Sequence, residues 1–474
     1  MLFNSAVFIL LFLLVYLLYW HIPLKGKHTL IILASFVFYA WFSLPFLLFF
    51  LFLIAVNYRI SLILLQKKSR FWLTFALVLD IGSLAFFKYF YLFAEGIGYA
   101  VQAATGSDYL VHLRENWRND HNFEILLPIA ISFYTFQIVA WVVDSYRGTI
   151  QEKVPFKKFC VFILFFPQFV AGPIMRAQDF IPQIDNPTPT RDRILNGSLL
   201  LIAGVFKKVL IADQIGAISR DAWIHPEKYD ATVLVLMLPA FIVRIYCDFS
   251  GYTDMARGLA KLLGYEIPEN FRAPFLTYSM SEIWQKWHIT LSTWLRDYIY
   301  IPLGGSRLGE LRTYRNILLT MALAGLWHGA SWTMILWGIF MGLVLAWERF
   351  FRVRGMQLLP NASWANGLRI ARTFALFSAS TLLFAAPDIT RSLRILEGIF
   401  TLQRGLPLTA LETMLGLSII GFLFNIPQRS SAIKDFLNAR PRLRYVAATG
   451  LTFLAGFLVN LYGNASGSFI YFNF

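Results

Sequence analysis

The sequence predicts an all-α, multi-pass membrane protein, and three features carry that prediction. Hydrophobic residues make up 57% of the 474 positions and charged residues only 15%, unlike a water-soluble domain. Apolar runs separated by short polar loops recur along the chain, and several approach the ~20 residues with which a helix crosses a bilayer. Basic residues gather in the short loops beside these runs.

We expect about ten to twelve transmembrane helices, with some short runs re-entrant or lying at the interface. The apolar runs lie at residues 2–20, 29–41, 45–65, 71–93, 159–170, 194–211, 232–245, 316–326, 333–347, 374–386, 411–424 and 445–461. The first run has no basic segment before it and no small-residue cleavage site, so we expect it to stay as the first span.

The formal net charge of +15 reflects membrane topology rather than a nucleic-acid partner. Lys67, Lys68 and Arg70 follow the third apolar run. Basic residues in such short loops fit the rule that cytoplasmic loops carry an excess of lysine and arginine. We therefore expect no nucleic acid to bind. Cys160 and Cys247 lie in or beside apolar runs, so the sequence shows neither a disulfide framework nor a zinc-ligand spacing.

Two apolar stretches are interrupted. Residues 123–148 contain Pro128 and Gln137, and polar side chains at membrane depth either satisfy a broken helix or line a cavity. Residues 155–182 contain four prolines, which predicts a helix that breaks near one face of the membrane.

Charged residues also follow the run at 232–245. Arg244 lies near its end, and Asp248 and Asp254 come shortly after it. Charge at this depth is costly unless it is paired or faces water. These residues therefore form either an Arg–Asp pair at the headgroup level or the wall of a polar funnel. Residues 264–315 hold no stretch long enough to span, which indicates a re-entrant or cytoplasmic segment.

A helix is predicted to begin at Ser279, because Ser279 and Glu282 fit a capping box. Continued at helical spacing, it has an aromatic face made of Trp284, Trp287, His288, Leu291, Trp294, Leu295 and Tyr298. Such a helix suits the membrane interface and places His288 on its buried side. The histidine has either a chemical role there or a structural one, bonded to a backbone carbonyl.

His328 ends the uncharged run NILLTMALAGLW and precedes Gly329, which is expected to end or kink the helix. An ionisable residue at membrane depth marks a functional site by default. Burial favours the neutral imidazole, which is the form that a general base requires. A purely structural histidine is the alternative.

Other kinds of site find little support. The sequence contains no G-x-S-x-G elbow, Walker A loop, H-E-x-x-H motif or paired cysteines. His288, His328 and Cys247 are too irregularly spaced to indicate a metal, so we expect none.

Three central segments carry a resemblance to a known family. They are CDFSGYTDMARGLAKLLGYEIPENF, EIWQKWHITLSTWLRDYIYIPLGG and GLWHGASW, and the earlier FFPQFVAGPIMR and the closing FIYFNF also agree. With them the chain resembles the membrane-bound O-acyltransferase (MBOAT) family, in its alginate O-acetyltransferase branch. The resemblance implies a ring of helices around a central funnel or tunnel, formed by one domain over residues 1–474. Within it, 1–245 are N-terminal spans, 246–332 the catalytic core and 333–474 C-terminal spans.

The resemblance also implies an activity. The protein is expected to take acetyl from cytoplasmic acetyl-CoA and pass it across the bacterial inner membrane. A periplasmic SGNH-type acetyltransferase partner would then esterify the hydroxyls of a polysaccharide. The acceptor is an alginate-like exopolysaccharide, another polymer such as cellulose, or peptidoglycan.

The family's signature histidine falls on His328 and its second functional histidine on His288, so these are the expected catalytic residues. Cations are needed for the phosphates of acetyl-CoA, and the candidates are Arg272, Lys286, Arg296 and Arg307. The expected tunnel-lining residues are Trp287, Trp294, Trp327 and Ser331, and Asp248 and Asp254 are expected to be structural.

Two other functions stay open at this point. One is a transporter or flippase with a histidine proton relay, although the internal repeats of many transporters are not evident here. The other is transfer of D-alanyl or lipid acyl groups.

Overall fold

The computed structural model of the chain describes residues 3, 5–356, 359–429 and 450. In these ranges the chain is helical, with isolated bridge pairs and no strand, as the sequence predicted. It divides into two compact units. Unit 1 comprises Met1–Val170 and Ile174–Pro187, and unit 2 comprises Ala171–Pro173 and Thr188–Phe474. The predicted run at 445–461 lies outside the described residues, apart from position 450.

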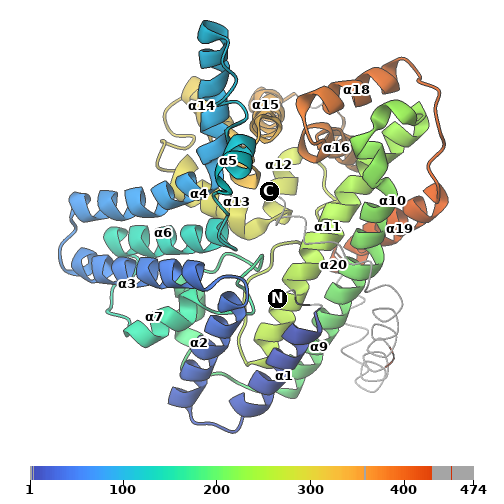
Figure 1. The fold of residues 1–474 in the computed structure, drawn as a ribbon. Helices are drawn as coiled ribbons and strands as arrows, with labels where there is room; N and C mark the ends of the chain where they lie inside the picture. The colour runs from blue at the N-terminus through green and yellow to red at the C-terminus, as the bar shows by residue number, and fades with distance from the viewer. Residues whose placement is uncertain (1–2, 4, 357–358, 430–449, 451–474) are drawn as a thin grey trace. The chain divides into compact units, whose positions relative to one another are not determined.

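Unit 1 contains the helices that are drawn from blue to teal in Figure 1. They are α1 (Ala6–Tyr19), α2 (Leu24–Ala40), α3 (Leu44–Gln66), α4 (Arg70–Thr105), α5 (Leu113–His121), α6 (Ile131–Arg147), α7 (Phe156–Ile163), α8 (Ala177–Phe180) and the 3₁₀ turn η1 (Ile181–Gln183).

The interruptions predicted in unit 1 are present. The helix after Pro128 begins only at Ile131, and α7 ends at Ile163. Gln137, which is buried, donates from Nε2 to the carbonyl oxygen of Phe162 at 2.8 Å. Of the two alternatives for Gln137, the structure therefore supports satisfaction of a broken helix, because the amide pairs a carbonyl near the end of α7.

Unit 2 contains the remaining elements. They are α9 (Arg191–Val205), the π-helical η2 (Phe206–Ala212), α10 (Asp213–Ile224), η3 (Pro226–Lys228), α11 (Ala231–Leu262), α12 (Met280–Lys286), α13 (Ile289–Leu295), the π-helical η4 (Arg296–Tyr300), α14 (Glu310–His328), α15 (Trp332–Val353), η5 (Ser363–Ala365), α16 (Asn366–Ala379), α17 (Thr381–Ala385), α18 (Ile389–Phe400), α19 (Leu411–Leu423) and α20 (Asn425–Arg429).

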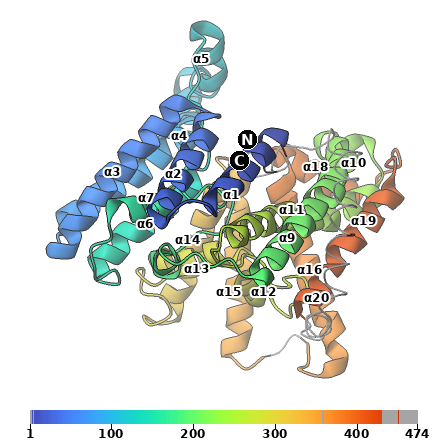
Figure 2. The same cartoon turned by 90° about the horizontal axis from the view of Figure 1, so that it is seen from below.

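The long helix α11 is the centre of unit 2. It runs beside α9, and both views show the two helices side by side (Figures 1 and 2). Gly204 on α9 and Gly251 on α11 face each other so closely that a Cβ on either would meet the other's carbonyl oxygen at 2.5–2.7 Å. Small residues thus let the two backbones approach, as is usual between membrane helices.

Six helical segments in the described ranges are long and apolar enough to cross a membrane. They are Leu44–Gln66, Arg70–Thr105, Arg191–Ile224, Ala231–Leu262, Trp332–Val353 and Ser363–Ala385. Ala6–Tyr19 and Leu411–Leu423 are apolar but shorter. The chain is therefore a multi-pass membrane protein, while the total of about ten to twelve spans stays a prediction.

Packing between α14 and α15 generates a test. A Cβ on Gly338 of α15 would lie 2.2 Å from the carbonyl oxygen of Met321 on α14, whereas one on Gly416 of α19 would meet nothing within 4 Å. We expect Gly338→Ala to lower the free energy of unfolding by about 1–3 kcal/mol because the helices must separate. Thermal unfolding in detergent measures this, with Gly416→Ala as the control. Equal stability of the two variants would contradict the close packing.

Candidate active site

His288 lies at a sharp break between α12 and α13. α12 begins as predicted, with the Ser279 hydroxyl accepting from the backbone N–H of Glu282 at 3.1 Å. It ends at Lys286, and His288 has φ 43° and ψ 53°, which is the left-handed conformation. The continuous aromatic-faced helix expected from the sequence is therefore wrong, because the chain leaves the helix at this histidine. Such a residue costs about 1–3 kcal/mol and persists only where its surroundings hold it.

A neighbouring loop holds the break from both sides. Ahead of it, the backbone N–H of Arg272 donates to the carbonyl oxygen of Lys286 at 2.9 Å. Behind it, the carbonyl oxygen of Asn270 accepts from the N–H of Ile289 at 3.0 Å. The carboxamide oxygen of Asn270 also accepts from the Thr290 hydroxyl at 2.6 Å. Because Asn270 is fully buried, these bonds are shielded from water and position the histidine.

His328 ends α14, as its place before Gly329 predicted. Its side chain is buried, with 3% of its surface exposed. The rings of Trp327, Trp337 and Phe384 surround it at centroid distances of 5.0, 5.1 and 5.4 Å. The imidazole is therefore enclosed by aromatic side chains of unit 2.

The structure brings the two histidines together. Trp327 contacts both, with its ring 5.8 Å from that of His288 and 5.0 Å from that of His328. Phe249 of α11 packs edge-on against His288 at 4.6 Å. Burial, and to a smaller degree His328, lower the pKa of His288 well below its ordinary value of 6.5. His288 lies outside the candidate spans. Because its pKa is lowered, its ring is neutral at physiological pH.

A small cavity borders His328. Its volume is about 20 Å³, which is room for about one water molecule. Trp287, Trp337 and side chains of α11, α16 and α17 line it. Its polar members are Ser380 and Thr381, whose hydroxyls donate to the carbonyl oxygens of Phe377 and Ser378 at 2.6 Å. The Ser380 hydroxyl oxygen also accepts from the indole N–H of Trp337 at 3.3 Å.

A larger polar cavity borders the loop that contains Asn270. Its volume is about 460 Å³, and Asn270, Phe271 and Arg272 line it together with Asp254 and Arg257 of α11. One loop thus borders this cavity and positions His288.

The other residues predicted for the site are distributed around it. Lys286 pairs with Glu282 at 2.7 Å, Arg296 with Asp297 at 2.7 Å and Arg272 with Glu269 at 3.2 Å, while Arg307 is exposed. Trp294 is buried against Tyr298, with ring centroids 5.1 Å apart. The Ser331 hydroxyl caps α15 by accepting from the N–H of Met334 at 3.3 Å.

Buried lysines pair with the acidic residues of α11. Lys208 lies 2.8 Å from the carboxylate of Asp248 and 2.7 Å from that of Asp213, and all three are buried. Lys207 pairs with Asp254. Asp248 therefore forms an ion pair with a lysine from the π-helical η2, a partner that the sequence did not suggest. A π-helical turn places successive side chains where an α-helix does not.

Several residues of the site were not predicted from the sequence. They are Trp337, Ser380, Thr381 and Phe384 around His328, and Lys207 and Lys208 against α11. The polar SAST stretch inside the apolar run at 374–386 was an available signal. In the described residues, no group of three or more His, Cys, Asp or Glu side chains is arranged to hold a metal ion.

Sequence comparison finds similar proteins along most of this chain. Residues 123–358 match the model of the membrane-bound O-acyltransferase family. The chain is 37% identical over 410 residues to the probable alginate O-acetylase of Azotobacter vinelandii, covering 85% of this chain and 78% of that protein. It is 36% identical over 409 residues to the Pseudomonas aeruginosa protein of that name, covering 85% and 75%. It is 30% identical over 441 residues to the peptidoglycan O-acetyltransferase of Helicobacter pylori, covering 85% and 80%.

The lysine between two carboxylates is testable. We expect Lys208→Met to lower the free energy of unfolding by about 3–5 kcal/mol, because it leaves Asp213 and Asp248 charged and buried. Thermal unfolding in detergent measures the loss, and the exposed Lys228→Met is the control. Adding Asp213→Asn and Asp248→Asn to Lys208→Met is expected to restore part of it. No recovery would mean that the lysine acts through packing alone.

The lowered pKa of His288 predicts a pH dependence of stability. The neutral ring contributes fully to the free energy of unfolding above pH ~6.5. This contribution is lost as the pH falls, because only the unfolded chain then takes up a proton at His288. Relative to His288→Gln, the wild-type protein is expected to lose up to about 1.4 kcal/mol per pH unit below that point. Unfolding temperatures between pH 5 and 8 measure the difference. His121→Gln, at an exposed histidine, is the control, and a flat wild-type difference would contradict the burial argument.

Proposed function

Because this chain belongs to the membrane-bound O-acyltransferase family, we propose that it transfers acetyl from cytoplasmic acetyl-CoA across the bacterial inner membrane for O-acetylation of a cell-envelope or secreted polysaccharide. That it is a membrane acyltransferase follows from the family and from its relatives. The donor, the acceptor and the inner membrane are the proposed parts. Family membership favours this activity over a transporter with a proton relay.

One observation supports the catalytic centre above the others. His328 is buried among aromatic rings, beside a second buried histidine, and borders a cavity with room for about one water molecule. A neutral imidazole that is shielded from bulk water accepts a proton from a hydroxyl without competition from solvent.

The reaction is one of acyl transfer. An acceptor hydroxyl attacks the thioester carbonyl carbon, so that a C–O bond forms and the C–S bond breaks. His328 is proposed to take the hydroxyl proton and deliver it to the departing thiolate. His288, held by the Asn270 loop, is proposed to orient or polarise the thioester carbonyl.

The substrates are proposed to reach this centre from both faces. Arg272, Lys286, Arg296 and Arg307 are proposed to attract the anionic donor. Its route is proposed to be flanked by Trp287, Trp294, Trp327 and Ser331. The alginate and peptidoglycan enzymes among the relatives support a polysaccharide as the final acceptor. A periplasmic SGNH-type partner is proposed to complete the transfer.

The role of His328 has a direct test. We expect His328→Ala to lower transfer of labelled acetyl from acetyl-CoA by at least about 10²-fold, because the general base is gone. The assay uses the purified full chain in nanodiscs, with a hydroxyl acceptor and separation of the labelled ester. His121→Ala, an exposed histidine, is the control. Undiminished transfer by His328→Ala, with unchanged unfolding temperature, would refute the assignment.

A further inference from the structure

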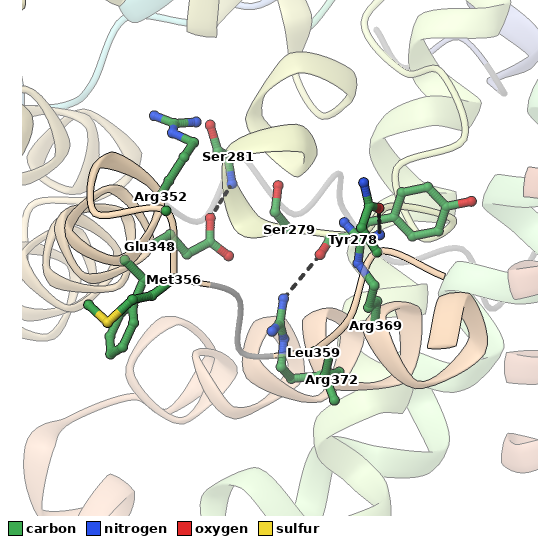
Figure 3. A pocket seen from close by; sticks show the side chains of 12 residues that line it. Tyr278, Ser279, Ser281, Glu348, Arg352, Met356, Leu359, Arg369 and Arg372 are labelled. Carbon is green, nitrogen blue, oxygen red and sulfur yellow. Dashed lines mark hydrogen bonds between the residues drawn. The ribbon is translucent and has the colours of Figure 1, made fainter. Parts of the chain in front are cut away.

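A second cavity of unit 2 lies apart from the histidines. Its volume is about 320 Å³, and it lies between the start of α12, the end of α15 and the first turns of α16. Figure 3 shows Glu348 and Arg352 of α15 on one side of it, and Arg369 and Arg372 of α16 on the other. Three guanidinium groups therefore border one pocket.

The carboxylate at this pocket is already bonded to backbone N–H groups. Glu348 is the acidic residue among its described lining, and its two carboxylate oxygens accept from the backbone N–H groups of Met280 and Ser281 at 2.8 and 3.0 Å. This carboxylate caps α12 instead of pairing with an arginine. In the described ranges, Arg352, Arg369 and Arg372 form no ion pair with a carboxylate.

Neutral groups hold the two arginines of α16 in place. Arg372 donates from Nη2 to the carbonyl oxygen of Tyr278 at 3.1 Å, and Arg369 donates from Nη1 to the Asn361 side chain at 2.7 Å. The Arg369 guanidinium also stands over the Tyr278 ring, 4.7 Å from its centroid. Both side chains are half-buried. Their hydrogen-bond partners are neutral, so these bonds fix the two guanidinium groups without neutralising their charge. This arrangement suits an anion that accepts forked hydrogen bonds, such as a phosphate ester.

The pocket and the His328 cavity share two helices. Along α16, Arg372 precedes the cavity-lining Phe377 by five residues, or about 8 Å of helix. Along α15, Glu348 follows the cavity-lining Trp337 by eleven residues, or about 16 Å. A ligand anchored in the pocket by phosphate therefore needs an extended arm of roughly this length to reach His328. A pantetheine chain is such an arm.

The basic end of α15 places the pocket on a particular face of the membrane. Arg352 of the pocket is followed by Arg354 in the same turn, and Arg349 precedes it. An excess of arginine beside a candidate span marks the cytoplasmic side. This is the face on which a nucleotide thioester is available.

We propose that the pocket at Arg352, Arg369 and Arg372 binds the phosphate groups of the acyl donor, a nucleotide whose pantetheine arm carries the thioester toward His328. The inference rests on the proposed function. It adds a site for the donor's phosphates that is separate from the cations expected from the sequence.

Donor truncation tests this site. Turnover is measured with acetyl-CoA and with S-acetylpantetheine, which lacks the phosphates, using the full chain in nanodiscs. We expect Arg369→Gln/Arg372→Gln to lower kcat/KM for acetyl-CoA at least tenfold through KM, and to leave kcat/KM for S-acetylpantetheine within twofold. Arg369→Lys/Arg372→Lys, which keeps the charge but not the fork, is expected to lie between the two. Arg354→Gln, beside the pocket and paired with Glu310, is the control and is expected to change neither value.

Binding of labelled CoA distinguishes failure of the proposed function from failure of the pocket assignment. His328→Ala is expected to bind CoA as the wild-type protein does, and the double glutamine variant at least tenfold more weakly. If the wild-type protein binds CoA through the pocket but transfers no acetyl, the proposed function fails and the pocket stands. If transfer occurs and the double variant binds CoA normally, or loses both donors equally, the pocket assignment is overturned.

An anionic lipid headgroup is the other source of a phosphate ester. The same CoA titrations in phosphatidylcholine and phosphatidylglycerol nanodiscs distinguish the two sources. We expect the double glutamine variant to bind CoA at least tenfold more weakly than the wild-type protein in both lipids. If the variant instead reduces only the binding of labelled phosphatidylglycerol and leaves CoA affinity intact, the pocket is a lipid site and the donor proposal is wrong.

Discussion

The charge balance on α11 is the constraint on which the architecture of unit 2 depends. An apolar helix that carries Asp248 and Asp254 can be buried only if cations accompany those carboxylates. Lys208 and Lys207 supply them from η2, and the π-helical turn there puts both ammonium groups against α11. With these carboxylates paired, α11 contributes to both the His328 cavity and the polar cavity that Asn270 lines.

The second constraint is the left-handed residue at His288. Its strain is tolerated because Asn270 bonds the chain directly after the break, while Phe249 and Trp327 pack the ring. The break turns a potential surface helix into two short helices that carry an imidazole inward. Asn270 also lines the polar cavity, so one buried residue both positions the histidine and borders that cavity.

The features that the sequence predicted well are those set by local chemistry. The cap at Ser279, the end of α14 before Gly329 and the interruption after Pro128 each depend on residues within a few positions of one another. The one clear error, an unbroken helix through His288, came from a correct aromatic periodicity. Periodicity reports which residues are buried, but it does not report a residue whose backbone is held out of the helix by a loop about twenty positions earlier.

The sequence by itself determined that this is a helical, multi-pass membrane protein of an acyltransferase family with two chemically distinctive histidines, because composition, apolar run length and contiguous motifs are all local properties of the chain. Only the tertiary structure decided that Lys208 neutralises Asp248, that Phe384 and Ser380 from the C-terminal third surround His328, and that Arg352, Arg369 and Arg372 share one pocket. These pairings join segments separated by tens of residues. Their energies come from burial and charge compensation, which exist only once the helices have packed.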